Sequence, residues 1–175
     1  MIFKGFRKNS AQKHINNSLN RSRANAVSNR IKTVGIVYNL DELKNIDLLK
    51  SLTGTLNVKE TDVKIVGYSK KAPESAPSFG DAFGPKDFNW MGKIKHPDLK
   101  QFVETPFDIL ISYYAEDVTE LKMITVDSAS NFKVGILQTD DRLNDLIVKT
   151  SANDFNTFKK ELKKYLLILN KIADE

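Results

Sequence analysis

The stretch that decides the fold is Thr33-Val-Gly-Ile-Val-Tyr38, an uninterrupted apolar run that follows a long polar segment. Such a run is typical of a strand buried on both faces, as in a parallel sheet. Directly after it, Asn39 or Asp41 can cap a helix that closes near Gly54. A second buried strand is predicted at Asp62–Tyr68. This strand–helix–strand order predicts a right-handed βαβ unit.

Further strands and helices alternate along the rest of the chain. Buried strands are predicted at Phe107–Ser112, Phe132–Leu137 and Leu146–Val148, with helices over residues 98–104 and 117–129 between them. Alternating strands and helices indicate an α/β fold. We therefore expect a mainly parallel, Rossmann-like or flavodoxin-like sheet of four or five strands flanked by helices.

The strongest helical pattern lies at the end of the chain, where Asn153 or Asp154 can cap the helix. Its apolar positions recur at helical spacing, so one broad face should cover the sheet. The residues of that face are Phe155, Phe158, Leu162, Tyr165, Leu166, Leu169 and Ile172. The opposite face carries Lys159, Lys160, Lys163 and Lys164.

A long irregular segment, residues 69–97, separates the second predicted strand from the third. Such loops are often functional in compact domains. Phe88 and Trp90 lie here among other aromatic residues, followed by Lys93 and Lys95. Aromatic rings beside cations can stack unpaired bases, which makes Trp90 and Phe88 candidate base-stacking residues. The favoured interpretation is that these rings form a small core beneath the loop.

Charge is distributed unevenly along the chain. The first forty residues contain eight Lys or Arg and no Asp or Glu, whereas the remaining 135 contain 19 basic and 22 acidic residues. The positive net charge therefore belongs to an N-terminal arm, residues 1–31, that precedes a slightly acidic domain, residues 32–175. Asymmetry of this kind indicates a polyanionic partner.

The arm carries one narrow helical stripe, Ala11, Ile15 and Leu19. So few apolar residues cannot offset the entropy of ordering the backbone. We expect the arm to be mostly disordered in the free protein and to become helical from Lys8 to Asn20 when it binds a partner.

RNA is the polyanion that this arm fits best, because Lys and Arg neutralise phosphates while Asn, Ser and Gln can donate to phosphate and 2′-hydroxyl oxygens. The sequence therefore predicts a non-enzymatic, cytoplasmic RNA-binding protein, with ribosomal RNA or a ribosomal subunit as the expected partner. A merely solubilising tail, an anionic membrane contact and a transit peptide remain alternatives. The predicted nucleic-acid-binding residues are Lys4, Arg7, Lys8, Lys13, Arg21, Arg23, Arg30 and Lys32.

No residue pattern predicts catalysis, a metal or a cofactor. The chain has no cysteine and two histidines without ligand spacing, and the glycine signatures of nucleotide-binding loops are missing. Two acidic pairs, Asp41-Glu42 and Asp140-Asp141, follow predicted strands and could hold Mg²⁺ at the sheet edge. The favoured interpretation is that they cap the following turn or helix.

The run from Ile31 to Leu137 resembles an uncharacterised family of small α/β proteins from Bacteroidetes. The similarity rests on the basic leader and on four motifs: Ile31-Lys-Thr-Val-Gly-Ile-Val37, Phe88-Asn-Trp90, Phe107-Asp-Ile-Leu-Ile111 and Phe132-Lys-Val-Gly135. The resemblance implies an α/β fold in a bacterial cytoplasm and no activity, cofactor or catalytic residue. An enzyme or ligand-binding domain that uses the carboxyl ends of the strands, and a protein-interaction adaptor, remain the alternative functions.

Overall fold

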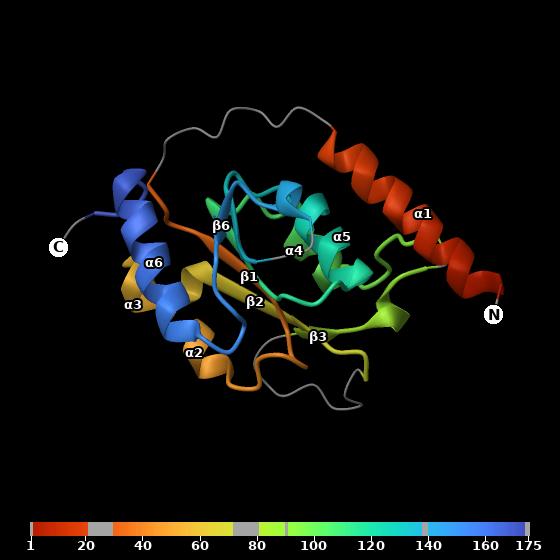
Figure 1. Cartoon of the computed structure of the whole chain (residues 1–175), viewed down its shortest axis with the longest axis horizontal. Helices are drawn as coiled ribbons and strands as arrows, with labels where there is room; N and C mark the ends of the chain where they lie inside the picture. Colours follow the sequence, from red (N-terminus) through yellow and green to blue (C-terminus); the bar gives the residue numbers. More distant parts are fainter. Residues whose placement is uncertain (1, 21–29, 72–80, 90, 138–139, 174–175) are drawn as a thin grey trace.

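The structure is a computed structural model that describes residues 2–20, 30–71, 81–89, 91–137 and 140–173. Within these residues the chain forms a six-stranded sheet in which every neighbouring pair is parallel. The strand order is β3-β2-β1-β4-β5-β6 (Figure 1). The strands are β1 Val34–Asn39, β2 Val63–Tyr68, β3 Asp81–Phe83, β4 Ile109–Tyr113, β5 Lys133–Ile136 and β6 Leu146–Val148.

The order of the strands is that of a doubly wound Rossmann sheet. The opening strand β1 lies in the middle, where Val34 is in register with Val63 of β2 on one side and Ile109 of β4 on the other. The predicted α/β fold with a parallel sheet is confirmed. The sequence missed β3, a three-residue strand within the segment predicted to be irregular.

Helices cover both faces of the sheet (Figure 1). They are α1 Ile2–Leu19, α2 Ile46–Lys50, α3 Leu52–Leu56, α4 Pro97–Glu104, α5 Thr119–Asp127 and α6 Phe155–Ile168. One apolar core lies between the sheet and α2, α3 and α6. A second core lies on the opposite face, beneath α4 and α5, and includes residues of α1.

The centre of the sheet is packed so closely that one position admits only glycine. A Cβ atom at Gly35 of β1 would lie 2.6 Å from the ring of Phe107, closer than carbon atoms approach in folded proteins. Phe107 is itself buried and packs against Phe102 of α4, with ring centroids 5.2 Å apart. Gly35 therefore lets the second core reach the central strand.

The helix predicted after β1 forms as two short helices. Asn45 caps α2 by accepting a hydrogen bond from the backbone N–H of Asp47 at 3.0 Å. Ser51 separates α2 from α3 and has right-handed helical dihedral angles. The helix α3 includes Gly54 and ends at Asn57, whose φ of 53° is the left-handed conformation common at helix C-termini.

The N-terminal helix α1 packs on α5 of the same chain. Ala11 and Ile15 are buried and Leu19 is partly buried, so the predicted stripe is the contact face. His14 Nε2 lies 2.6 Å from Asp127 Oδ1 at the end of α5. The sequence predicted an arm that is mostly disordered in the free protein and helical from Lys8 to Asn20 when it binds a partner; the structure instead shows a helix over Ile2–Leu19 that packs on the same chain. Burial of the stripe offsets the ordering entropy that favoured disorder.

Candidate nucleic-acid interface

The described cations of the N-terminal segment point to solvent. Lys8 and Lys13 are exposed on α1, and neither forms an ion pair with the described part of the chain. The side chains of Lys4 and Arg7 lie outside the described part of the structure, as does the whole segment that holds Arg21 and Arg23. Two of the predicted phosphate-binding residues on α1 are therefore exposed to solvent.

Arg30 and Lys32 lie at a different place from α1. Between them, the backbone N–H of Ile31 donates to the carbonyl of Lys171 at 2.8 Å, just beyond α6. The backbone N–H of Lys32 donates to Asp108 at 2.9 Å, while both side chains stay exposed. Figure 1 shows the chain entering β1 beside the end of α6, on the side of the molecule away from α1. The predicted cations thus form two groups.

Four lysines on α6 add a basic surface near the second group. Asp154 caps this helix by accepting the backbone N–H of Thr157 at 3.1 Å. The residues that face the sheet are Phe155, Phe158, Leu162 and Leu166, all buried. This alignment leaves Lys159, Lys160, Lys163 and Lys164, here called the α6 lysine row, on the outer side, as the sequence predicted.

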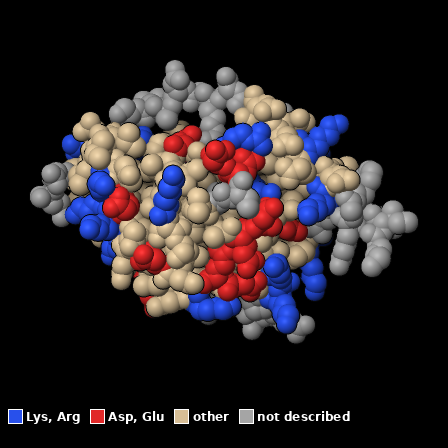
Figure 2. All heavy atoms as spheres, in the orientation of Figure 1, with Lys and Arg blue, Asp and Glu red and all other residues tan. Residues whose placement is uncertain are grey.

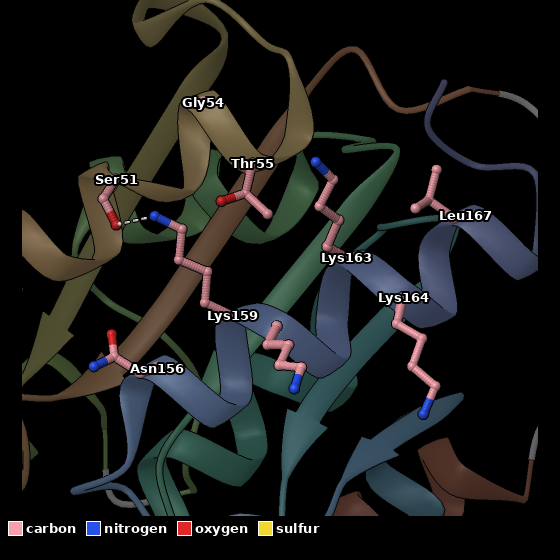
Figure 3. Close-up of a pocket in the computed structure, with 9 residues that line it drawn as sticks. Ser51, Gly54, Thr55, Asn156, Lys159, Lys163, Lys164 and Leu167 are labelled. Carbon is pink, nitrogen blue, oxygen red and sulfur yellow. Dashed lines mark hydrogen bonds between the residues drawn. The ribbon is translucent and has the colours of Figure 1, made fainter. Parts of the chain in front are cut away.

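The α6 lysine row forms one wall of a groove, and α3 forms the other (Figure 3). The ammonium group of Lys159 crosses the groove and donates to the hydroxyl of Ser51 at 3.3 Å. Figure 3 shows Lys159 and Lys163 directed toward α3, whereas Lys164 points away from it. The groove has a volume of about 580 Å³, and its lining residues are Ser51, Gly54, Thr55, Asn156, Leu167 and the α6 lysine row.

Acidic side chains neutralise little of this groove. Its lining contains no Asp or Glu. Glu161 pairs with Lys164 at 3.1 Å, and this hydrogen bond raises the pKa of the Lys164 ammonium. Lys160 and Lys163 form no ion pair within the described residues. In Figure 2, Lys and Arg are spread over the visible face and both ends of the molecule, while many acidic side chains gather near the middle.

The structure does not present Phe88 as a base-stacking residue. Its side chain is only 4% exposed, and its ring packs against Phe83 with centroids 6.2 Å apart. Phe83 in turn contacts Tyr68 of β2. Phe88 thus lies in a small core beneath the loop, where its ring is not accessible for base stacking. Trp90, the other candidate, lies outside the described residues.

The carboxyl edge of the sheet, where α/β folds bind ligands, is closed by one of the predicted acidic pairs. The carboxylate of Glu42 accepts the backbone N–H groups of Ala115 at 2.7 Å and Glu116 at 2.6 Å, just beyond β4. Asp41 accepts the hydroxyl of Ser69 and the backbone N–H of Lys70, both at 3.3 Å, just beyond β2. The pair joins three loops rather than capping the helix that follows.

The second acidic pair caps its own turn, as the favoured interpretation expected. Asp140 accepts the backbone N–H of Arg142 at 3.1 Å and pairs with its guanidinium at 2.8 Å. The hydrogen bond from Arg142 lowers the pKa of the Asp140 carboxyl. Among the described residues, no three His, Asp or Glu side chains are grouped as metal ligands would be.

Sequence reasoning missed the α3 side of the groove. Ser51, Gly54 and Thr55 are small and polar, and the pattern assigned them to the end of a helix rather than to a surface. The usable signal was four lysines with a single Glu on one face of the last helix, because solvated helix faces commonly alternate charge. The facing wall depends on how α3 packs beside α6, which no local pattern encodes.

Comparison with known proteins identifies a family but no function. No curated protein and no solved structure matches the chain. In the described residues, no helix has both the length and the apolar character needed to cross a membrane. The sequence pattern of DUF6913, a family of unknown function, matches residues 7–169. The match spans most of α1, the whole sheet and all of α6. The chain therefore belongs to the family of unknown function DUF6913.

Proposed function

We propose that this protein binds RNA without catalysing a reaction, and that it acts as a ribosome-associated factor in the cytoplasm of a bacterium. The observation that supports this proposal is the charge of the first forty residues, which hold eight cations and no acid. Four of those cations, Lys8, Lys13, Arg30 and Lys32, have described side chains, and all four are exposed.

Phosphate neutralisation provides the driving force. Each cation that meets a phosphate releases condensed counterions, which favours binding at moderate salt. Since no acid lies within this segment, no neighbouring carboxylate competes with the phosphates or repels them. Asn, Ser and Gln residues between the cations supply neutral donors for phosphate and 2′-hydroxyl oxygens. Ribosomal RNA fits because it presents phosphates from several directions, matching cations at two separate places on the domain.

The carboxyl edge of the sheet is arranged unfavourably for a nucleotide, which favours RNA binding over nucleotide chemistry. In a Rossmann sheet, backbone N–H groups at this edge receive the phosphates of a nucleotide. Here the carboxylate of Glu42 holds the N–H groups of Ala115 and Glu116. A phosphate would have to displace an anion that belongs to the protein itself. For this reason we prefer a basic surface to the strand ends as the functional site.

The test is sedimentation of the full chain. Tagged protein in a bacterial lysate is centrifuged through a sucrose gradient at low and high salt. The expected result is co-migration with a ribosomal subunit at low salt that is lost at high salt. Purified protein with purified ribosomal RNA should behave in the same way. Migration only at the top of the gradient would contradict ribosome association, and failure to bind the purified RNA would contradict the proposal as a whole.

A matched pair of variants shows whether the arm carries the binding. Lys8→Glu/Lys13→Glu reverses two exposed charges on α1, and Lys64→Glu/Lys149→Glu reverses two exposed charges on the body. Both change the net charge equally. Binding should weaken strongly for the first variant and little for the second. Equal weakening by the two variants would show a response to net charge instead of contact with the arm.

A further inference from the structure

The groove between α3 and α6 gives the domain a basic surface of its own, separate from α1. We propose that it binds backbone phosphates of the same RNA. The identity of the ligand rests on the proposed function, whereas the location of the site rests on the groove. The site combines ammonium groups of the α6 lysine row with the hydroxyls of Ser51 and Thr55 across from them.

The cations are arranged so that two of them meet one ligand. Lys159 and Lys163 lie one helical turn apart, about 6 Å along the axis of α6, and both are directed toward α3 (Figure 3). The only partner of the Lys159 ammonium in the described residues is the neutral hydroxyl of Ser51, so its charge is not compensated. A phosphate in the groove would accept from both ammonium groups and from the hydroxyl wall.

Without a ligand, the α6 lysine row is electrostatically unfavourable. Like charges one turn apart on a helix repel each other, and surface helices commonly place a Glu between such lysines. Within α6 only Glu161 does so, and it pairs with Lys164. Lys159, Lys160 and Lys163 therefore raise the electrostatic potential over the groove together. A bound polyanion relieves this repulsion, whereas a chloride ion from solution relieves it only transiently.

The groove connects to the N-terminal segment through the end of α6. Ile31 is hydrogen-bonded to the carbonyl of Lys171, which places Arg30 and Lys32 beside the C-terminal end of this helix. An RNA strand that contacts the second group of predicted cations thus has the α6 lysine row next to it. The two surfaces form one path from the entry of β1 along α6.

Groove chemistry favours RNA over a lipid surface. Seven of the nine lining residues have polar or charged side chains, the exceptions being Gly54 and Leu167, and hydroxyl, amide and ammonium groups suit phosphodiester oxygens. An anionic membrane is the competing occupant because Ile168 is 65% exposed and Leu169 is 42% exposed at the helix end. Membrane-binding helices use such apolar residues together with lysines. The experiment therefore includes a test of membrane binding.

Gly54 offers a sharp test because it lies in the groove wall and has free space around it. A Cβ atom there would meet no atom within 4 Å, so a side chain can be added without a clash. Gly54→Glu introduces a carboxylate opposite the lysines, and Gly54→Gln introduces the same shape without charge. Both residues have good helix propensity, so both variants should fold as well as the parent. Thermal melting checks this expectation.

Affinity is measured by filter binding of purified ribosomal RNA to the full chain at several salt concentrations. We expect Gly54→Glu to bind about tenfold more weakly than Gly54→Gln, and the slope of log K against log salt to become shallower by about 2, as two phosphate contacts are lost. Lys163→Gln should weaken binding in the same direction by a smaller factor. Equal affinity of the Glu and Gln variants would overturn the groove proposal.

The outcomes separate this inference from the proposed function. If Lys8→Glu/Lys13→Glu loses RNA and Gly54→Glu retains it, the protein binds RNA without the groove, and only the groove inference fails. If neither the parent nor the variants bind RNA, the proposed function fails as well. Flotation with vesicles of phosphatidylcholine and phosphatidylserine tests membrane binding. Binding of the parent to these vesicles but not to RNA, abolished by Gly54→Glu, would assign the groove to a membrane instead.

Discussion

The carboxylate of Glu42 and the backbone N–H of Ala115 are hydrogen-bonded at 2.7 Å, and this bond joins the end of β1 to the end of β4. The second carboxylate oxygen accepts the N–H of Glu116 at 2.6 Å. These two strands flank the point where a doubly wound sheet reverses direction. Besides the backbone pairing of β1 with β4, the Glu42 side chain therefore joins the loops that follow these two strands, at the edge where related folds hold a ligand.

Replacing Glu42 should destabilise the protein. In Glu42→Gln, one oxygen is replaced by an amide N–H that faces a backbone donor, so at least one N–H of the loop loses its acceptor. Loss of a charge-assisted bond at this position should cost about 1–3 kcal/mol of the free energy of unfolding. Urea denaturation provides the measurement. Glu116→Gln, which removes only a surface ion pair with Lys70, should cost less than about 1 kcal/mol.

The α1 helix should be a stable part of the domain. Ile15 is completely buried, and Ile15→Ala removes most of its contact with the second core. We expect the variant to lose about 2–4 kcal/mol of the stability that holds α1 on α5, while the exposed Lys13→Ala loses little. Hydrogen exchange over residues 8–19 reads the effect directly. Rapid exchange of these amides in the parent protein would show that α1 is undocked in solution, as the sequence alone predicted.

Deletion of residues 1–30 tests the remainder of the domain. The core between the sheet and α2, α3 and α6 contains Ile31 but no residue of α1. The truncated protein should therefore unfold cooperatively, at a lower temperature than the full chain because α5 loses its outer cover. Circular dichroism melting decides the matter. A broad, non-cooperative transition would mean that α1 is required for the fold of the domain.

Alkaline pH should destabilise the protein through its buried tyrosines. Burial raises the pKa of Tyr113 from 10.0 to about 12, and burial likewise raises the pKa values of Tyr38 and Tyr114. Between pH 10 and 12 the unfolded chain releases the Tyr113 proton and the folded chain does not, so stability falls as pH rises. Below pH 10 this tyrosine gives no pH dependence. Its share of the fall is about 1.4 kcal/mol per pH unit.

Tyr113→Phe separates this effect from general alkaline damage. The variant loses the hydrogen bond from the phenol to the Ala152 carbonyl, 2.9 Å long, so it should be less stable at neutral pH by about 1 kcal/mol. Its stability should then fall less steeply than that of the parent between pH 10 and 12. Parallel pH profiles for the two proteins, measured by urea denaturation, would contradict the assignment to Tyr113.

RNA affinity should depend steeply on salt. If six of the eight cations in the first forty residues meet phosphates, log K against log salt should have a slope of about −4 to −5. Filter binding across a salt series gives this slope. A slope near zero would exclude phosphate neutralisation as the source of affinity.

Much of the fold could be predicted because most strands of a parallel sheet are continuous apolar runs. The prediction for Leu146–Val148 matched β6 residue for residue. The predicted β1 begins and ends one residue too early, and the predicted β2 begins one residue too early. By contrast, β3 has three residues, of which Asp81 opens and Phe83 closes the strand, and so short a run has no period to detect. Its identity comes from pairing with β2, which is a tertiary property.

The candidate site could be predicted only in part. The α6 lysine row follows from helical periodicity, because four aromatic or aliphatic residues fix which side faces the sheet. The docking of α1 does not follow, because α5 buries five consecutive residues, Leu121–Thr125. A helix that is buried on two sides can be recognised as such only when the positions of both neighbouring elements are known. Lys122 and Thr125 made that segment look like an ordinary surface helix.

The position of β1 at the centre of the sheet has a consequence for synthesis of the chain. Thr33, which directly precedes this strand, is hydrogen-bonded to Asp108, a residue that lies 75 positions further along the chain. As the chain leaves the ribosome, β1 can pair first with β2, yet its other edge stays open until β4 emerges. During that interval the strand exposes unpaired backbone groups and apolar side chains. The nascent half-sheet is thus the stage at which a chaperone would have most to protect.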